Sequence, residues 1–275
     1  MKVVFWAGGL GTRMESLTEA MPKPMLDIGG KPILWHLMKF FSHFGVRDFI
    51  VCGGYKNESI KRYFLDYAGL IDDFTVNTDS GALNVHDTDH DDNWNVTISN
   101  TGGETYTAGR LLRVEKYIRG ENAGKPQQPG EEPFIVTYGD SLGDVNISSL
   151  VEQHKKGGKI ATVTAIQPIT RYGVIEFDED GSVVDFKEKP QMKEWVNAGF
   201  FVLEPAVFDI IRKCPDGAEK TMFEAAPITE LVKTGQLQVF KHNGYYQPVD
   251  TPRELKEVNK LWKNWKAPWE VWKRK

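Results

Sequence analysis

The chain has little cysteine, no long apolar run and no surplus of basic residues. Two cysteines among 275 residues, Cys52 and Cys214, cannot build a disulfide framework. No stretch approaches the roughly 18 consecutive apolar residues that a membrane-spanning helix needs, which excludes a spanning segment. A formal net charge of −4 excludes a general nucleic-acid binder, because such proteins carry an excess of Lys and Arg.

What the chain does contain is typical of a globular protein. Charged residues make up 26% and hydrophobic residues 40%, so neither disorder nor a fibrous repeat is expected. The opening MKVVFWAGG is a short apolar run closed by glycines, without the length or cleavage pattern of a signal peptide. Together with the scarcity of cysteine, this predicts a reduced, cytoplasmic protein whose length suits one large α/β domain.

Short apolar runs alternate with segments of helical periodicity in the first part of the chain. Residues 3–6 and 49–52 have the pattern of buried strands, and residues 34–44 and 60–67 that of helices. Pro32 is well placed to open the first of these helices, because proline is favoured at a helix start. The order strand, helix, strand, helix predicts a Rossmann-like, mixed and mostly parallel sheet that is flanked by helices.

The later segments predict additions to this sheet. Residues 71–100 hold seven aspartates and no Lys, Arg or Glu, and their short β-type runs predict an antiparallel β insertion. The Gly- and Pro-rich residues 120–133 predict an exposed loop. Residues 174–177 and 183–186 flank a turn and predict a hairpin. We also expect strands at 134–138 and 160–166, and helices at 150–154, 207–212, 225–232 and 254–265.

A glycine-rich turn, GGLGTR at residues 8–13, follows the first predicted strand. Glycines let backbone N–H groups approach an anion without obstruction by a Cβ atom. The turn alone favours an anion site and a purely structural turn equally. Two known glycine motifs are excluded, because Met14 stands at the third glycine of the dinucleotide fingerprint and Pro32 interrupts a Walker A pattern. An NAD-dependent oxidoreductase is thereby excluded.

Two cations lie close to this turn in the sequence. Arg13 ends it, and Lys23 follows between two prolines, Pro22 and Pro24, which restrict the backbone. A single lysine is normally a solvated surface residue. A rigidly presented lysine beside an anion-accepting turn, however, matches the local charge of a polyphosphate. The combination predicts phosphate binding.

Two aspartates are candidate metal ligands. Asp140 follows an apolar strand and a glycine, so we expect it at the carboxyl edge of the sheet, where α/β proteins bind ligands. A carboxylate near bound phosphates predicts a Mg²⁺ site. Asp250 is the candidate partner, although its local pattern favours an N-cap for the helix that follows near Pro252.

Several segments together resemble the sugar-1-phosphate nucleotidyltransferases. Residues 7–13 (AGGLGTR) with 22–25 (PKPM) are similar to the signature of that superfamily. Segments that point to its cytidylyltransferase branch are 28–36, 94–97, 107–111, 138–140, 247–251 and 267–269. The resemblance covers essentially the whole chain. It implies a single domain over residues 1–275 with the nucleotide-diphospho-sugar transferase fold.

The resemblance also implies a reaction, in which CTP and α-D-glucose 1-phosphate give CDP-glucose and pyrophosphate with Mg²⁺ as the cofactor. The sugar phosphate oxygen would attack the α-phosphorus in line. Such a transfer needs little covalent help, so positioning and charge neutralisation carry most of the catalysis. Also implied are a homo-oligomer and a role in nucleotide-sugar and surface-polysaccharide biosynthesis, with no nucleic acid or membrane as partner.

Roles for single residues follow from the same resemblance. The expected catalytic residues are Arg13, Lys23 and Asp140, and the expected metal ligands are Asp140 and Asp250. Contact with the sugar phosphate is expected for Glu188, Lys189 and Asn197, which without the resemblance would be only a polar strand end. Nucleotide contacts are expected for Gly8, Gly9, Gly11, Thr12, Arg13, Lys23, Gly109 and Arg110.

Four residues depart from the family pattern: Ala108, Ser141, Ala198 and Ala226. The first three replace expected glycines and the fourth replaces an acid, and we expect these changes around the sugar side of the site. A different sugar 1-phosphate, or another phosphorylated acceptor, therefore stays an open alternative. A catalytically silent nucleotide-binding subunit is less favoured, because such a protein has no chemical need for the expected triphosphate and metal residues.

Two further features predict structure rather than chemistry. The run HDTDHDD at residues 86–92 does not define a metal cage, and we predict a solvated loop. Four tryptophans fall within the last fourteen residues, among the eight Lys and Arg from Arg253 onward. We predict that segment 252–275 packs against the body or a neighbouring subunit rather than a membrane surface, because Pro268 interrupts the pattern.

Overall fold

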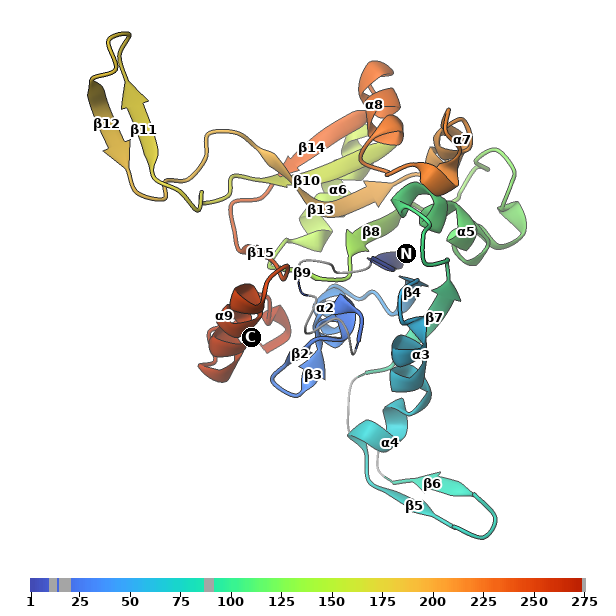
Figure 1. Ribbon diagram of the computed structural model, residues 1–275. Coiled ribbons are helices and arrows are strands. Elements are labelled where there is room, and N and C mark those ends of the chain that lie inside the picture. The colour runs from blue at the N-terminus through green and yellow to red at the C-terminus, as the bar shows by residue number, and fades with distance from the viewer. Residues whose placement is uncertain (10–13, 15–20, 87–91, 274–275) are drawn as a thin grey trace.

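A central β-sheet with helices on both faces forms the body of the protein (Figure 1). The computed structural model describes residues 1–9, 14, 21–86 and 92–273. Within these residues the sheet has seven strands in the order β14-β10-β13-β8-β1-β4-β7. They are β1 (Lys2–Ala7), β4 (Asp48–Gly53), β7 (Asn95–Asn100), β8 (Phe134–Tyr138), β10 (Ala161–Ile166), β13 (Val196–Leu203) and β14 (Leu237–Lys241).

Strand direction within this sheet confirms the predicted fold class. β13 runs antiparallel to both of its neighbours, β8 and β10, and the other neighbouring strands run parallel. The central strand β1 shows why both faces must be covered, since successive side chains in a strand point to opposite sides. Val3 and Phe5 belong to one hydrophobic core, whereas Val4 and Trp6 belong to the other.

The helices divide between these two cores. One face carries α2 (Ile33–His43), α3 (Asn57–Leu65), α6 (Ile147–Gly157) and α9 (Pro252–Lys263). The other face carries α5 (Thr107–Arg119), α7 (Val207–Arg212) and α8 (Ala226–Lys233). The predicted helix over 60–67 begins earlier, at Asn57, and is interrupted at Asp66, after which the short helix α4 (Tyr67–Ile71) follows.

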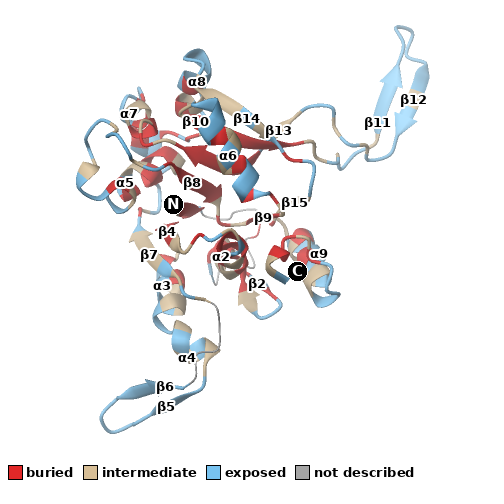
Figure 2. Cartoon of the chain, turned by 180° about the vertical axis from the view of Figure 1, so that it is seen from behind, coloured by how far each residue is buried: buried red, intermediate tan, exposed pale blue. Residues whose placement is uncertain are grey.

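Two antiparallel hairpins extend away from the body at opposite ends and are largely exposed (Figures 1 and 2). One consists of β5 (Phe74–Val76) and β6 (Leu83–Val85), and the other of β11 (Val174–Phe177) and β12 (Val183–Lys187). The second hairpin agrees with the sequence prediction. Residues 71–100 agree only in part, because β7 joins the central sheet parallel to β4.

Short elements complete the described chain. Two small ladders pair β2 (Asp27–Ile28) with β3 (Lys31–Pro32), and β9 (Ser141–Gly143) with β15 (Tyr246–Pro248). The 3-10 helices are η2 (Lys23–Met25), η3 (Gly120–Asn122), η4 (Ala218–Lys220) and η5 (Val271–Lys273). In the part of the chain that is described, no helix is long and apolar enough to cross a membrane.

The Trp-rich C-terminal segment packs on the body of the protein. Trp269 is 1% exposed and belongs to the core that includes α2. Its ring stacks on Tyr245 at a centroid distance of 5.8 Å. Trp262 and Trp272 pack around His36, whereas Trp265 stays 78% exposed. Three of the four tryptophans of this segment therefore pack against the body.

The end of the HDTDHDD run is not the solvated loop that the sequence predicts. Residues 87–91 lie outside the described residues, but the side chain of Asp92 is only 4% exposed. Its carboxylate accepts hydrogen bonds from Trp35 and Tyr67 and pairs with Lys39 at 2.7 Å. Burial alone would raise the pKa of Asp92, but these partners together have the larger effect. The pKa of Asp92 therefore lies below its ordinary value. Asp92 therefore anchors the chain to α2 and α4.

Candidate active site

The carboxyl ends of β1 and β8 meet at one edge of the sheet, because the two strands are parallel neighbours. The chain leaves β1 at Gly8 and leaves β8 at Gly139, whose N–H donates to the carbonyl oxygen of Trp6 at 2.9 Å. This bond ties the turn after β8 to the end of β1. Asp140 follows directly, so it lies at the predicted edge, where ligands bind in open α/β sheets.

Lys23 faces Asp140 because its short helix packs against the turn after β8. Pro24 is buried in η2, and a Cβ atom on Gly139 would lie 3.0 Å from the Cγ atom of Pro24. A glycine at 139 therefore permits the close approach. Lys23 Nζ lies 3.5 Å from Asp140 Oδ2 and donates a short hydrogen bond to Asp250 Oδ1. The three charged groups form one cluster.

The ladder between β9 and β15 brings Asp250 to this cluster. Ser141 pairs with Pro248, and the N–H of Val249 donates to the carbonyl oxygen of Asp140 at 2.9 Å. The N-cap of α9 is Thr251, whose hydroxyl accepts from the N–H of Glu254 at 3.3 Å. The local prediction of Asp250 as the cap is therefore wrong, and its carboxylate meets Lys23 instead.

Asp140 sits in a polar network that sequence reasoning did not find. Burial raises the pKa of Asp140; Lys23 opposes this effect and the nearby Asp250 adds to it. Ser141 Oγ lies 3.4 Å from Asp140 Oδ1, and the hydroxyl of Tyr246 lies 3.4 Å from Ser141 Oγ. Burial, with the negative charges of Asp140 and Asp250, raises the pKa of Tyr246 to about 12 against the effect of Ser141.

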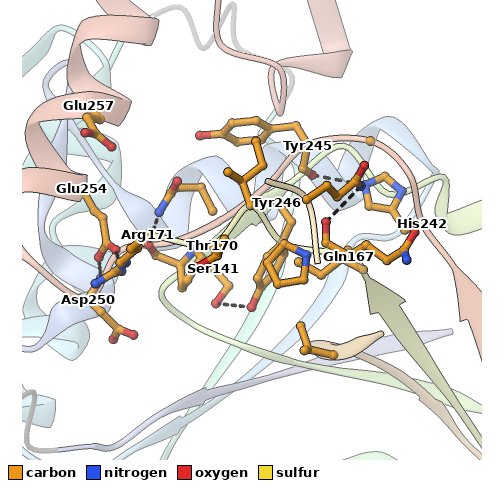
Figure 3. Close-up of a pocket in the computed structure, with 18 of the residues that line it drawn as sticks. Ser141, Gln167, Thr170, Arg171, His242, Tyr245, Tyr246, Asp250, Glu254 and Glu257 are labelled. Carbon is orange, nitrogen blue, oxygen red and sulfur yellow. Dashed lines mark hydrogen bonds and ion pairs between the residues drawn. The ribbon is translucent and has the colours of Figure 1, made fainter. Parts of the chain in front are cut away.

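A cleft of about 1140 Å³ opens beside these residues (Figure 3). Asp140, Asp250, Lys189 and Asn197 all line it, so four of the residues expected at the site share one cavity. Asn197 Oδ1 accepts from the N–H of Gly199 at 2.7 Å within β13, where Gly199 has a φ of 74°. The cleft is large enough for a small-molecule ligand.

Glu188 and Lys189 lie at the end of the exposed hairpin. Glu188 is not among the residues that line the cleft, and its carboxylate pairs with Lys189 Nζ at 3.4 Å. Lys189 has a φ of 47°, in the left-handed region that residues with a side chain seldom adopt. Both side chains are more than half exposed, so each can turn toward a ligand.

Only part of the expected nucleotide site lies within the described residues. Gly11, Thr12 and Arg13 fall outside them, whereas Gly8 and Gly9 are described. Gly8 is buried against the guanidinium of Arg110, which a Cβ atom on Gly8 would overlap at 1.9 Å. A side chain at position 8 would therefore displace the guanidinium of Arg110, whatever ligand the turn binds.

Arg110 is a buried residue that holds backbone carbonyls at the edge of the sheet. Its Nη2 donates to the carbonyl oxygen of Gly8 at 2.9 Å, and its Nη1 donates to that of Gly102 at 2.8 Å. Gly109 packs against another segment, since a Cβ atom there would lie 2.8 Å from the Cα atom of Glu219. Both residues thus have packing roles beside the nucleotide contacts that the resemblance implies.

The departures from the family pattern do not gather around the cleft as expected. Ala108 and Ala198 are both 0% exposed, and neither lines the cleft. Ala226, at the start of α8, does not line the cleft either. Ser141 alone among the four departures belongs to the lining. The methyl groups of Ala108 and Ala198 therefore do not reach this cleft, and the expectation that they lie on the sugar side finds no support in its lining.

The donor set suits a hard divalent cation bound together with phosphates. The carboxylates of Asp140 and Asp250 converge on a single positive atom, Lys23 Nζ, so the fold already holds a cation between them. Across the described ranges, no group of three or more His, Cys, Asp or Glu is placed to hold a metal ion. Mg²⁺ is commonly bound by one or two carboxylates that substrate phosphates complete.

Glu254 and Arg171 are two cleft residues that sequence reasoning missed. Glu254 Oε2 accepts from the N–H of Asp250 at 2.8 Å, and Glu254 Oε1 pairs with the guanidinium of Arg171. A signal for Glu254 exists in the sequence, because Thr251 followed three residues later by Glu is the pattern of a capping box. No comparable pattern marks Arg171.

Comparison with known sequences gives full-length matches. A family model described as Nucleotidyl transferase matches residues 2–266. A protein of Salmonella typhi named "Glucose-1-phosphate cytidylyltransferase" is 41% identical over 273 residues, covering 99% of this chain and 100% of that protein. A protein of Bacillus subtilis (strain 168) named "Probable glucose-1-phosphate cytidylyltransferase" is 42% identical over 272 residues, with the same coverage.

Comparison with solved structures supports the fold. The chain is similar to HddC from Yersinia pseudotuberculosis, with a TM-score of 0.63 and 25% identity over 94% of this chain and 98% of that one. It is also similar to a UDP-glucose pyrophosphorylase complexed with UDP-glucose, with a TM-score of 0.65 and 18% identity over 96% and 98%. These likenesses confirm the predicted nucleotide-diphospho-sugar transferase fold.

Proposed function

The chain belongs to the nucleotidyl transferase family, and from this premise we propose that it is a glucose-1-phosphate cytidylyltransferase. The reaction joins CTP and α-D-glucose 1-phosphate and releases CDP-glucose and pyrophosphate. Identity of 41–42% along the full length to relatives of that name supports the choice of substrates. The observation that carries the chemistry is the cluster of Lys23, Asp140 and Asp250 at the carboxyl edge of the sheet.

In the proposed reaction, a phosphate oxygen of the sugar 1-phosphate attacks the α-phosphorus of CTP. The bond from that phosphorus to the bridging oxygen breaks, and pyrophosphate leaves with its electron pair. Lys23 and Arg13 would neutralise the triphosphate, and the backbone from Gly8 to Thr12 would hold it in line. Lys189 and Asn197 would orient the sugar phosphate, because both line the cleft beside Asp140.

Mg²⁺ is the proposed cofactor. Asp140 and Asp250 would hold it, and when bound it supplies positive charge to the triphosphate. Burial and repulsion between the two carboxylates work against full ionisation of Asp140, as its raised pKa indicates. Lys23 compensates for part of this repulsion by pairing with both. A homo-oligomeric assembly and a cytoplasmic location stay predictions from the sequence.

The lining of the cleft gives no reason to replace glucose 1-phosphate by a different sugar 1-phosphate. Ala108 and Ala198, which depart from the family pattern, are fully buried and do not reach it. Ser141 is the departure that reaches the cleft. Its hydroxyl donates to Asp140 and accepts from the hydroxyl of Tyr246. The surface offered to the sugar is therefore changed less than the sequence alone suggests.

A matrix of nucleotides against sugar 1-phosphates tests this proposal directly. CTP, UTP and dTTP are each combined with glucose, mannose and galactose 1-phosphate, and pyrophosphate release is measured with Mg²⁺ present. We expect the highest kcat/KM with CTP and glucose 1-phosphate. A preference for another nucleotide or sugar would overturn the assigned substrates, and no release with any pair would overturn the activity itself.

Asp140→Asn tests the role of the carboxylate cluster. Loss of one of two converging charges should lower kcat by about 10²–10³-fold, a cost typical of removing one group that stabilises the transition state electrostatically. The thermal midpoint should change little, because asparagine has the same shape. The control is Asp209→Asn, an exposed residue of α7 that pairs with Arg212, and it should leave kcat unchanged. Full activity of Asp140→Asn would contradict the assignment.

A further inference from the structure

One ion pair at the cleft joins two segments that are far apart in the sequence. Arg171 lies between β10 and β11, and its guanidinium pairs with the carboxylate of Glu254 in the first turn of α9 (Figure 3). The two partners differ in burial, since the side chain of Arg171 is 71% exposed and that of Glu254 is 6% exposed. Arg171 can therefore turn to another partner, whereas Glu254 cannot leave.

Glu254 has a second bond that does not depend on Arg171. Its Oε2 accepts from the N–H of Asp250 at 2.8 Å, while Oε1 pairs with Arg171. Thr251 caps the helix separately through the N–H of Glu254. The start of α9 and the position of Asp250 thus keep their hydrogen bonds when Arg171 turns away. The ion pair is not needed to build the helix.

The carboxylates that line the cleft would repel an anionic ligand, so a cation that can change partners would favour binding there. The lining carries the four carboxylates Asp140, Asp250, Glu254 and Glu257, whereas the ligand of the proposed reaction is an anion. A phosphate group approaching these carboxylates is repelled unless arginine or lysine side chains meet it. Of the lining cations, Arg171 is the one bound next to the backbone of Asp250, through Glu254.

We propose that the guanidinium of Arg171 exchanges partners. It leaves the carboxylate of Glu254 and binds the phosphate of the sugar 1-phosphate, and so acts as a specificity-determining residue. This inference rests on the proposed function. A guanidinium binds a phosphate through two parallel hydrogen bonds, which suits a group that must recognise a terminal phosphate. Glu254 competes with the substrate for the same guanidinium. The free protein thus holds the arginine at the cleft and releases it only to an anion.

Glu254→Gln separates this exchange from a structural role, because the two predict opposite signs. The amide oxygen of glutamine still accepts from the N–H of Asp250, so the start of α9 is preserved. Without the competing charge, KM for glucose 1-phosphate should fall about two- to fivefold, as expected for an ion pair in which one partner is exposed to solvent, and KM for CTP should stay unchanged. A purely structural role of Glu254 predicts instead a raised KM and a lowered thermal midpoint.

Arg171→Ala should have the opposite effect on the same constant. Loss of charge-assisted hydrogen bonds should raise KM for glucose 1-phosphate about 10- to 100-fold with little change in kcat, and Arg171→Lys should recover part of the loss. The double variant should stay close to Arg171→Ala, because the guanidinium for which Glu254 and the phosphate compete is then absent. Glu152→Gln, which breaks an exposed ion pair with Lys156 on α6, is the matched control and should change neither KM.

The outcomes separate this inference from the proposed function. If the wild-type protein releases no pyrophosphate with any substrate pair, the proposed function fails, and the exchange fails with it. If the wild type is active but Glu254→Gln raises KM for glucose 1-phosphate, or Arg171→Ala leaves it unchanged, the exchange alone is overturned. Calorimetric titration with glucose 1-phosphate and with glucose adds a readout without turnover, since only the phosphorylated ligand should respond to the variants.

Discussion

At the scale of single residues, the tautomer of His36 is fixed by two neighbours on opposite sides of its ring. Its Nε2 lies 2.9 Å from the carbonyl oxygen of Ile28, and the indole N–H of Trp269 donates to its Nδ1 at 3.4 Å. An indole nitrogen can only donate, so Nδ1 must keep its lone pair and Nε2 carries the proton. Burial and the charge of Lys31 lower the pKa of His36 to about 4, against the effect of Ile28.

The protein should therefore lose stability as the pH falls from 6.5 to 4. In this window the unfolded chain, with an ordinary pKa of 6.5 for histidine, binds a proton that the folded protein does not bind. The loss is on the order of 3 kcal/mol and levels off below pH 4, where both states are protonated. Urea unfolding between pH 4 and 7 measures it.

His36→Phe should flatten this dependence while lowering stability at every pH, because Trp269 and Ile28 each lose a partner. His43→Phe, at the exposed end of the same helix, is the control and should keep the slope of the wild type. An unchanged slope in His36→Phe would show that other groups cause the acid sensitivity.

The site residues differ in how well the sequence predicts them. Lys23 and Asp140 carry local signals, namely flanking prolines and a position directly after a buried strand. Asp250 carries none, because its partner is reached only through β9 and β15, and a strand of three residues is too short to show a periodic pattern. Arg110 is a similar case, since nothing local reveals that its guanidinium is enclosed by backbone carbonyls.

At the scale of elements, Arg110 on α5 joins the turn after β1 to the turns after β4 and β7. Its guanidinium donates to the carbonyl oxygens of Gly8, Gly53, Gly102 and Gly103 and to the hydroxyl of Thr101. A Cβ atom at Gly54 would also overlap the guanidinium. One side chain therefore sets the shape of three neighbouring turns at the edge where the nucleotide is proposed to bind.

Arg110→Lys should destabilise the protein by about 2–3 kcal/mol, because a single ammonium cannot pair all of these buried carbonyls. If Arg110 acts by shaping the turn, KM for CTP and for UTP should rise by the same factor. A change in the preference for CTP over UTP would show instead that Arg110 contacts the base. The control is Arg113→Lys on the same helix, a half-exposed residue whose replacement should cost less than about 1 kcal/mol.

Strand and helix positions are predicted well where the pattern is long. The helices α2, α7 and α9 and the strands β1, β8 and β10 lie at or within a few residues of their expected positions. The sequence does not reveal that β7 is a parallel edge strand of the main sheet. None of the residues of β7 is fully buried, so its apolar pattern matches that of an exposed antiparallel strand.

At the scale of the whole molecule, the C-terminal segment closes one face of the protein. Ala267, Trp269 and Val271 are buried in the same core as α2, and Trp262 covers Gly29 so closely that a Cβ atom there would overlap the indole. The segment therefore belongs to the folded body. Lys273 lies over the rings of Trp262 and Trp265, at 5.4 and 4.4 Å from the ring centroids.

Trp269→Ala should destabilise the protein by about 3–5 kcal/mol, the usual cost of removing a large buried aromatic side chain. Trp265→Ala, four residues earlier, is the matched control, because its ring is 78% exposed. It should cost less than about 1 kcal/mol, the worth of an exposed contact between a cation and a ring. Thermal or urea unfolding compares the two. Equal losses would contradict the burial of Trp269 as the cause.

The sequence separations within the Lys23 cluster also determine when, during synthesis, this cluster can form. Lys23 meets Asp140 and Asp250 at separations of 117 and 227 residues along the chain. Contacts this distant form late, since closing long loops costs entropy before the contacts reward it. A nascent chain that ends before β15 contains Lys23 and Asp140 but not yet Asp250. Synthesis must therefore pass residue 250 before both of the proposed metal ligands are present.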